Sequence, residues 1–279
     1  MINYKMDKII INSNTLIILI IVIIITVYIY NKQKTVNYKS NRIFKLNNKI
    51  KVLTYNIERI PIYIRPKVNI DKLMEKCDIL CLQENFCNLI GSNKQSYDYN
   101  CIIPKGSFYK LIDSGLSIYS KYPMKYINFI GFNKSSIIES LIFKGFLVVQ
   151  IADFILINTH LQASLNINDD NSDIALNQLK TILLYIKKHN YHKVLICGDF
   201  NLNLKQLSVN GYNTISTDQP TNYAYYNDYL GLKSSAKPIK NYTGFYLDGA
   251  LSKNINISNI KTIIYDKYSD HKGVSFDII

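Results

Sequence analysis

Short apolar runs separated by turn residues make up most of the chain from residue 49 onward. Eight of these runs are rich in Ile, Val, Leu and Tyr, which predicts buried β-strands. The predicted strands cover residues 51–56, 79–83, 115–119, 146–151, 154–159, 194–199, 246–251 and 274–278. The two strands at 146–151 and 154–159 meet over Ala152 and Asp153, which is typical of a tight hairpin.

One segment has the period of a helix instead. Asp173 is the predicted N-cap of a helix over 174–189, and Lys187, Lys188 and His189 lie near its negative end. The predicted apolar face of this helix comprises Leu176, Leu179, Ile182, Leu183 and Ile186. Hairpins mixed with strand–helix–strand units predict an α/β domain of two sheets packed face to face with flanking helices.

The chain before these strands contains a long uncharged stretch. Residues 16–30 read LIILIIVIIITVYIY and would span roughly 22 Å as a helix, or about 33 Å when extended back to Ile9. The stretch ends in Tyr, Asn and Lys, whereas a signal peptide ends in small residues, and it lacks the polar face of a core helix. We therefore predict an uncleaved transmembrane anchor over 15–30, after a short N-terminal tail over 1–14.

Residues 31–48 are polar and basic and are predicted to form a tether that contacts anionic lipid. The span is preceded by Lys5 and Lys8 and followed by six basic residues, Lys32, Lys34, Lys39, Arg42, Lys45 and Lys49. The positive-inside tendency therefore places the large domain over 49–279 in the cytosol, on a single-pass membrane anchor.

Composition narrows the classes of protein further. The 279 residues are 48% hydrophobic, which excludes a mostly disordered chain. A net charge of +13 invites a nucleic-acid interpretation, but only Arg42, Arg59 and Arg65 are Arg, and Trp is absent. Because Ile, Asn, Lys and Tyr share AT-rich codons, biased composition accounts for much of this charge. Five Cys without a CxxC pair argue against a disulfide framework.

Polar clusters lie at the ends of five predicted strands. They read TYNIE (54–58), LQEN (82–85), NTHLQ (158–162), GDFN (198–201) and SDHKG (269–273). Clusters at the ends of buried strands would converge on one edge of a sandwich. Carboxylate and amide oxygens without Cys favour a hard cation such as Mg²⁺ or Mn²⁺, and two His on different strands suit proton transfer. Together they predict metal-assisted hydrolysis at phosphorus.

Each cluster alone also has a plain structural interpretation. Asn56 can form a turn, Glu84 can be a solvated residue after a strand, and Asp199 can cap a following helix. His189 and His192 lie in a Lys-rich helix end and loop, and they are assigned no role.

The order YN, QE, TH, GDFN, D and SDH across residues 51–279 resembles the endonuclease/exonuclease/phosphatase superfamily. The resemblance implies the DNase I-like fold, a four-layer α/β sandwich of two packed mixed β-sheets flanked by helices. It also implies that the active site lies at one end of the sheets. The implied metal-site residues are Asn56, Glu84 and Asp270, with Glu84 as the principal Mg²⁺ ligand.

The same resemblance implies roles for five more residues. Asp199 and Asn201 resemble the pair that contacts the phosphate, positions the nucleophile or holds a second metal. His160 resembles the His that stabilises or protonates the phosphoryl oxygens. His271 resembles the general base that takes a proton from water, and Asp248 resembles the carboxylate that orients this base.

Within the superfamily, several stretches resemble sphingomyelinases: SGLSIYSKYPM (114–124), THLQAS (159–164), the Lys-Gly pair at 144–145 and the run over 220–248. Nuclease branches fit less well, because Tyr122 stands where DNase I-type enzymes have a carboxylate partner for His160. Gly249 also departs from sphingomyelinases, which prefer an aromatic residue after the matching Asp.

We therefore expect a membrane-anchored, Mg²⁺-dependent phosphodiesterase that hydrolyses a phospholipid headgroup ester. The membrane lipid is then both the substrate and the environment of the anchor, and no protein partner is implied. A nuclease of the same fold, acting on nucleic acid, and a non-catalytic membrane protein that retains the fold are the alternatives.

Overall fold

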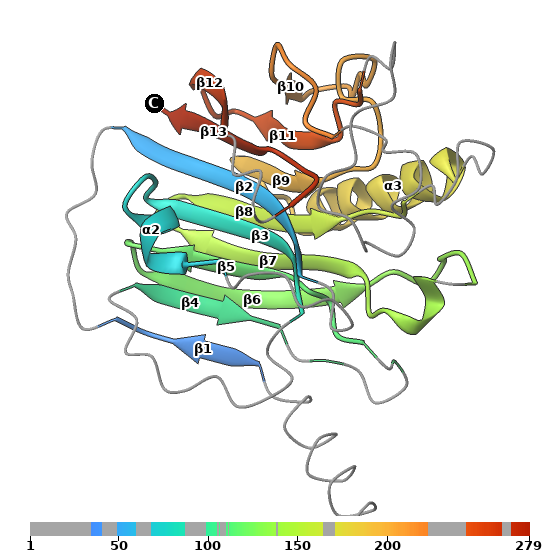
Figure 1. Cartoon of the computed structure of the whole chain (residues 1–279), viewed down its shortest axis with the longest axis horizontal. Helices are drawn as coiled ribbons and strands as arrows, with labels where there is room; N and C mark the ends of the chain where they lie inside the picture. The colour runs from blue at the N-terminus through green and yellow to red at the C-terminus, as the bar shows by residue number, and fades with distance from the viewer. Residues whose placement is uncertain are drawn as a thin grey trace, which may run out of the picture.

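The apolar runs of the sequence form two mixed β-sheets that pack face to face (Figure 1). In the first sheet the order is β1 (Val36–Tyr38), β4 (Asn100–Ile103), β5 (Ser117–Ser120), β3 (Ile79–Asn85), β2 (Ile50–Arg59), β13 (Gly273–Ile278) and β12 (Ile257–Ile263). In the second it is β10 (Asn213–Ile215), β11 (Asp248–Lys253), β9 (Val194–Asp199), β8 (Phe154–His160), β7 (Gly145–Ile151) and β6 (Met124–Gly131). This computed structural model describes residues 35–40, 49–59, 68–86, 99–104, 106, 110, 112–137, 139–163, 171–222, 244–263 and 269–279.

Helices cover the outer faces of both sheets. The short helix α2 (Ile70–Met74) packs Leu73 and Met74 onto the first sheet, and α3 (Ser172–Lys188) packs onto the second. A third apolar cluster, which includes Val52, Leu147 and Phe276, fills the space between the sheets. The predicted sandwich of two mixed sheets with flanking helices is therefore confirmed in these parts of the chain.

The helix α3 departs from its prediction in two respects. Its N-cap is Asn171, so Asp173 lies within the first turn and does not cap the helix. Leu176 is 45% exposed, and the prediction that it belongs to the buried face was wrong. Gln178 is buried in its place, because its side-chain oxygen accepts a hydrogen bond from the backbone of Gln162 at 2.8 Å.

All eight predicted strands form, with ends that shift by a few residues, and the hairpin turns at Ala152 and Asp153. The strands that were not predicted are β1, β4, β6, β10 and β12, which lie at or near sheet edges. The strand β1 lies inside the range predicted as a tether and pairs antiparallel with β4, so residues 36–38 belong to the sheet.

The predicted tail over 1–14 and the predicted transmembrane anchor over 15–30 lie outside the described residues. Among the helices of the described ranges, none is long and apolar enough to cross a membrane.

Strand directions bring the ends of six strands to one edge of the sandwich. The strands β2 and β3 run parallel, as do β8 and β9, so their carboxyl ends lie together. The strands β13 and β11 run antiparallel to β2 and β9, and their first residues therefore reach the same edge; Asp248 pairs directly with Asp199. Gly198 allows β9 to approach β8 closely, since a Cβ there would lie 2.0 Å from the carbonyl oxygen of Thr159.

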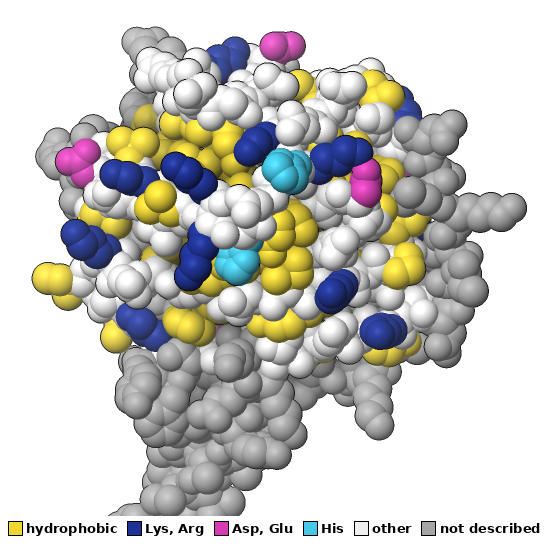
Figure 2. All heavy atoms as spheres, turned by 180° about the vertical axis from the view of Figure 1, so that it is seen from behind, with side chains coloured by type: hydrophobic (Ala, Val, Ile, Leu, Met, Phe, Trp, Pro, Cys, Tyr) yellow, Lys and Arg dark blue, Asp and Glu magenta, His cyan; other side chains and the backbone are white. Residues whose placement is uncertain are grey.

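Basic side chains are dispersed on the face of the molecule turned away in Figure 1. Figure 2 shows Lys and Arg side chains lying mostly singly among apolar and uncharged ones on that face. This arrangement differs from the continuous basic stripe that tracks a nucleic-acid backbone.

Candidate active site

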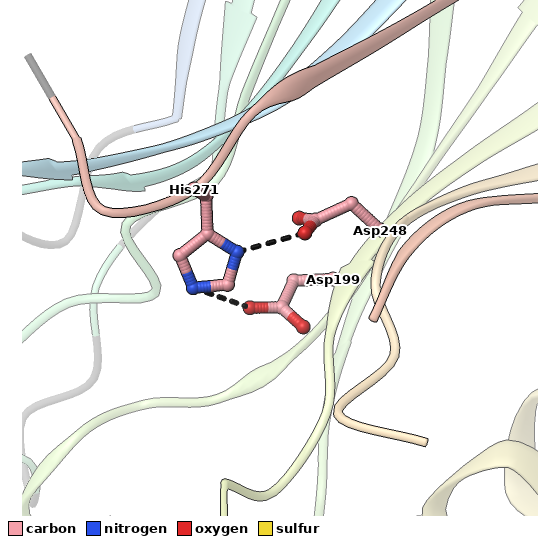
Figure 3. Close-up of side chains that lie close together, drawn as sticks. All are labelled: Asp199, Asp248 and His271. Carbon is pink, nitrogen blue, oxygen red and sulfur yellow. Dashed lines mark hydrogen bonds and ion pairs between the residues drawn. The ribbon is translucent and has the colours of Figure 1, made fainter. Parts of the chain in front are cut away.

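A buried imidazole–carboxylate pair forms the centre of the site (Figure 3). His271 Nδ1 lies 2.8 Å from Asp248 Oδ2, and both side chains are buried. Thr221 fixes the backbone that carries this carboxylate, because its hydroxyl oxygen accepts hydrogen bonds from the backbone N–H groups of Leu247 and Asp248. The pair therefore leaves Nε2 of the imidazole directed toward Asp199, at 3.7 Å from Oδ2.

Asn56 ties the buried carboxylate of Asp199 to the partly buried carboxylate of Glu84. Its amide nitrogen donates to Glu84 Oε1 at 3.1 Å and to Asp199 Oδ2 at 3.0 Å. Its amide oxygen accepts from the backbone N–H of Glu58 at 3.0 Å. In this arrangement Asn56 positions Glu84 and Asp199, and its oxygen would reach a cation only if the amide turned over.

His160 approaches the same carboxylate oxygen of Asp199 as His271 does. Its Nε2 is 3.7 Å from Asp199 Oδ2 and 3.9 Å from Glu84 Oε1. The Oδ2 atom of Asp199 is thus equally far from the two imidazoles. A group bound beside this oxygen would therefore lie near both imidazoles.

The side chain closest to His160 is Lys144, whose Nζ lies 3.2 Å from Nε2. Lys144 also donates to Glu139 Oε1 at 2.7 Å and to the backbone oxygen of Leu161 at 2.9 Å. These contacts use all three ammonium hydrogens, so Lys144 holds the imidazole in place. Tyr122, at the position where the resemblance led us to expect a carboxylate in DNase I-type enzymes, is buried in the core between the sheets.

The remaining predicted residues frame this centre. The backbone N–H of Asn201 donates to Asp199 Oδ1 at 2.9 Å, while its amide donates to the backbone of Leu161 at 3.1 Å. Asp270 is partly exposed, and its Oδ1 lies 3.9 Å from His271 Nε2. The structure therefore brings all eight predicted residues to one edge, and the roles assigned to them stay predictions.

Sequence reasoning gave no role to Lys144, Glu139, Thr221 or Ser269. Ser269 donates to the backbone oxygen of Asn56 at 2.7 Å and accepts from the backbone N–H of His271 at 3.0 Å. It thus fixes the segment before β13 against the end of β2. The Lys-Gly pair at 144–145 was the available signal for Lys144, and nothing in the local sequence marks the other three.

Burial and mutual repulsion perturb the acids of the site. Burial raises the pKa of Glu84, and burial together with Asp248 raises the pKa of Asp199 to about 7. Burial alone would lower the pKa of His271, but the carboxylates of Asp248, Asp270 and Asp199 raise it well above its usual value. Burial and the adjacent Lys144 ammonium hold the pKa of His160 well below its usual value.

These groups fit a divalent cation. One ligand atom from each of Asp199, Asp248 and His271 lies within 4.8 Å of the others. Two buried carboxylate oxygens, Glu84 Oε2 and Asp248 Oδ1, have no hydrogen-bond partner in the described part of the chain. Buried carboxylate oxygens of this kind are suitable ligands for Mg²⁺, and a cation would offset their repulsion.

The sequence pattern of the Endonuclease/Exonuclease/phosphatase family matches residues 53–271. The chain belongs to this family. The match spans every strand end that carries the site, from the strand before Asn56 to His271. The predicted superfamily membership is therefore confirmed.

Solved structures of this family share the fold. Beta toxin from Staphylococcus aureus, as a mutant with bound magnesium ions, is 17% identical over 82% of this chain and 99% of its own, with a TM-score of 0.52. Sphingomyelinase C from Streptomyces griseocarneus is 16% identical, covering 83% and 99%, with a TM-score of 0.51. TDP2 from D. rerio, complexed with a single-strand DNA product, is 15% identical, covering 84% and 100%, with a TM-score of 0.57. Comparison with curated proteins finds no match.

Proposed function

We propose that the chain is a Mg²⁺-dependent phosphodiesterase that hydrolyses the headgroup ester of a membrane phospholipid. The observation that carries the proposal is the buried His271–Asp248 pair directed at Asp199, with His160 near the same Asp199 oxygen. A base oriented by a carboxylate, next to a cluster of acids that fits a cation, suits water attack on phosphorus.

His271 is placed to act as the base. With Nδ1–H donated to Asp248, Nε2 points into the site. The neighbouring acids raise the pKa of His271 in the metal-free chain, so Nε2 would be free to accept a proton from water once a cation offsets these acids. The oxygen of that water then bonds to phosphorus as the ester bond to the lipid oxygen breaks. The lipid alkoxide takes up a proton from solvent water, and the phosphorylated headgroup leaves with the oxygen of the attacking water.

His160 would interact with the phosphoryl oxygens. Its pKa is lowered, so the imidazole is neutral at pH 7 and adds no charge to the site. In this structure its Nε2 accepts from Lys144, so donation from Nε2 to a phosphoryl oxygen would require the other tautomer. Lys144 is a positioning residue in this scheme, because its hydrogens are used on Glu139, Leu161 and His160.

Glu84 would be the principal ligand of the cation, since its Oε2 is buried and has no hydrogen-bond partner in the described residues. Asp199 lies against it through Asn56, and Asp270 borders the solvent side. When bound, the cation stabilises the negative charge that develops on the phosphoryl oxygens. The magnesium-bound beta toxin supports the choice of Mg²⁺.

Two sequence features favour a lipid as the substrate. Stretches 114–124 and 159–164 resemble sphingomyelinases, and the uncharged run over 15–30 would anchor the cytosolic domain in the plane of lipid headgroups. The fold relatives include a sphingomyelinase and a protein with a DNA product, so substrate class requires a direct test.

The test uses the full chain reconstituted into vesicles that contain sphingomyelin and phosphatidylcholine, with Mg²⁺. We expect release of the phosphorylated headgroup and loss of this activity in His271→Ala, with His192→Ala as the matched control. His192 is exposed and lies outside the site. Cleavage of single-stranded DNA without lipid hydrolysis would instead support the nuclease alternative, and residual activity of His271→Ala above about 10% would refute its role as base.

A further inference from the structure

The connection between β6 and β7 carries an exposed apolar turn beside the active site. Ile137 is 90% exposed, the highest value for a large hydrophobic side chain in the described residues, and Leu141 is about half exposed. Figure 1 shows this connection projecting beyond the sheets at the end where β8 finishes in His160. Large aliphatic side chains in such a position indicate a surface that another phase or molecule covers.

The inner side of the same turn is attached to the site. The backbone N–H of Ser136 donates to the Gln162 side chain at 2.9 Å, and Gln162 donates back to the Ser136 hydroxyl at 2.9 Å. Glu139 is buried and receives the hydrogen bond from Lys144, which contacts His160. The exposed residues are therefore held in a fixed relation to the site and do not belong to a loose loop.

The distribution of charged side chains on the turn indicates which kind of surface it binds. The one acid in residues 132–143 is Glu139, which is buried and paired with Lys144. The exposed side of the turn thus carries Ile137 and Leu141 with no exposed acid, and Lys134 is exposed a short distance before them. Aliphatic groups next to a Lys match a bilayer interface, where acyl chains lie below a plane of phosphates.

We propose that this turn docks the domain on a phospholipid bilayer, with Ile137 and Leu141 in the interface and Lys134 at the phosphates. The inference rests on the proposed function, because it takes the bilayer to be where the substrate lies. The turn orients the site over the headgroups, while the predicted anchor holds the chain at the membrane.

Tryptophan fluorescence tests the docking directly. The chain contains no Trp, so Ile137→Trp creates a single reporter at the tip of the turn. Leu184→Trp is the matched control, since Leu184 is also exposed but lies on the outer side of α3. Both variants of the full chain are reconstituted into phosphatidylcholine vesicles with nitroxide-labelled lipids, and acrylamide is added to the aqueous phase.

We expect lipid-borne nitroxide to quench the reporter at position 137 at least several-fold more than the one at 184, and acrylamide to quench it less. Equal quenching of the two reporters would overturn the docking proposal. This measurement needs no catalysis. If the vesicles show docking of the turn but no lipid is hydrolysed, the docking stands and the proposed function fails.

Activity provides a second measurement. The double variant Ile137→Asn/Leu141→Asn should hydrolyse vesicle phospholipid about tenfold more slowly or worse. Insertion of one aliphatic side chain into the bilayer raises the membrane-binding constant by about tenfold or more, and the variant loses two such side chains. Its loss on the water-soluble bis(p-nitrophenyl) phosphate should be much smaller, and Leu184→Asn should affect neither substrate. Equal losses of the double variant on both substrates would contradict docking and indicate a disturbed site.

Discussion

The buried pair of Lys144 and Glu139 predicts an unusual pattern of stability in a double-mutant cycle. The two side chains are 2% and 8% exposed, and Nζ lies 2.7 Å from Oε1. Lys144→Met keeps the length of the side chain but leaves the Glu139 carboxylate buried without its cation. Removal of one partner of a buried ion pair costs about 3–5 kcal/mol, a large fraction of the 5–15 kcal/mol that holds a typical domain.

Replacement of both partners removes the stranded charge. We therefore expect Glu139→Gln/Lys144→Met to be more stable than Lys144→Met, with a coupling energy of about 2 kcal/mol or more. The assay is urea unfolding of the full chain in mild detergent, followed by far-UV circular dichroism. Lys193→Met is the control, since its partner Asp153 is largely exposed and such pairs contribute about 0–1 kcal/mol. Additive effects of the two substitutions would refute the reasoning.

Three further predictions concern the site and the strands that build it. Asp248→Asn should lower kcat for phosphodiester hydrolysis about 10³-fold or more with an unchanged circular dichroism spectrum, because the imidazole of His271 loses its orienting charge. The pKa of Asp199 is raised to about 7, so this carboxyl stabilises the metal-free fold below its ordinary pKa and loses that contribution as pH rises through 7. In chelator, the stability of the chain relative to Asp199→Asn should therefore fall from pH 4 to pH 8 in urea titrations, and Mg²⁺ should reduce the fall. Gly198→Ala should prevent soluble expression or lower Tm by more than 10 °C, because its Cβ would lie 2.0 Å from the Thr159 carbonyl oxygen.

The central strands could be predicted because both of their faces are buried. The strands β8 and β9 are buried throughout, and each begins with a continuous apolar run, FILI and VLIC. The missed strand β6 reads MKYINFIG and is only partly buried, so its pattern is weaker. The missed strand β12 has no buried residue. How far an edge strand is buried depends on which segments pack against it, and the local sequence does not specify those segments.

The helix α3 shows how tertiary contacts override a local pattern. Leu176 is exposed although a buried position was predicted for it, and Gln178 is buried instead. The Gln178 side chain accepts a hydrogen bond from the backbone of Gln162 and donates one to the backbone of Lys134, so its polar atoms have partners in the interior. A hydrophobicity pattern treats Gln as a surface residue, since it contains no information about distant partners.

The same limit applies to the residues that support the site. Polar clusters at strand ends identified the residues that converge, because strand order alone brings those ends together. The supports act through contacts between distant segments: Ser269 reaches the backbone of Asn56, and Thr221 reaches that of Asp248. Asn56 is an intermediate case, predicted at the right place but oriented as a hydrogen-bond donor to two acids.

The orientation of Asn56 explains how so many acids can share one edge. Its single amide group bonds Glu84 and Asp199, and His271 bonds Asp248, so each buried carboxylate has at least one partial counter-charge. These contacts do not neutralise the cluster, since the pKa values of Glu84 and Asp199 remain raised. Burial, together with repulsion between the carboxylates, therefore favours a cation that binds there, and it disfavours a phosphate that enters first. We therefore expect ordered binding, in which Mg²⁺ precedes the phosphodiester.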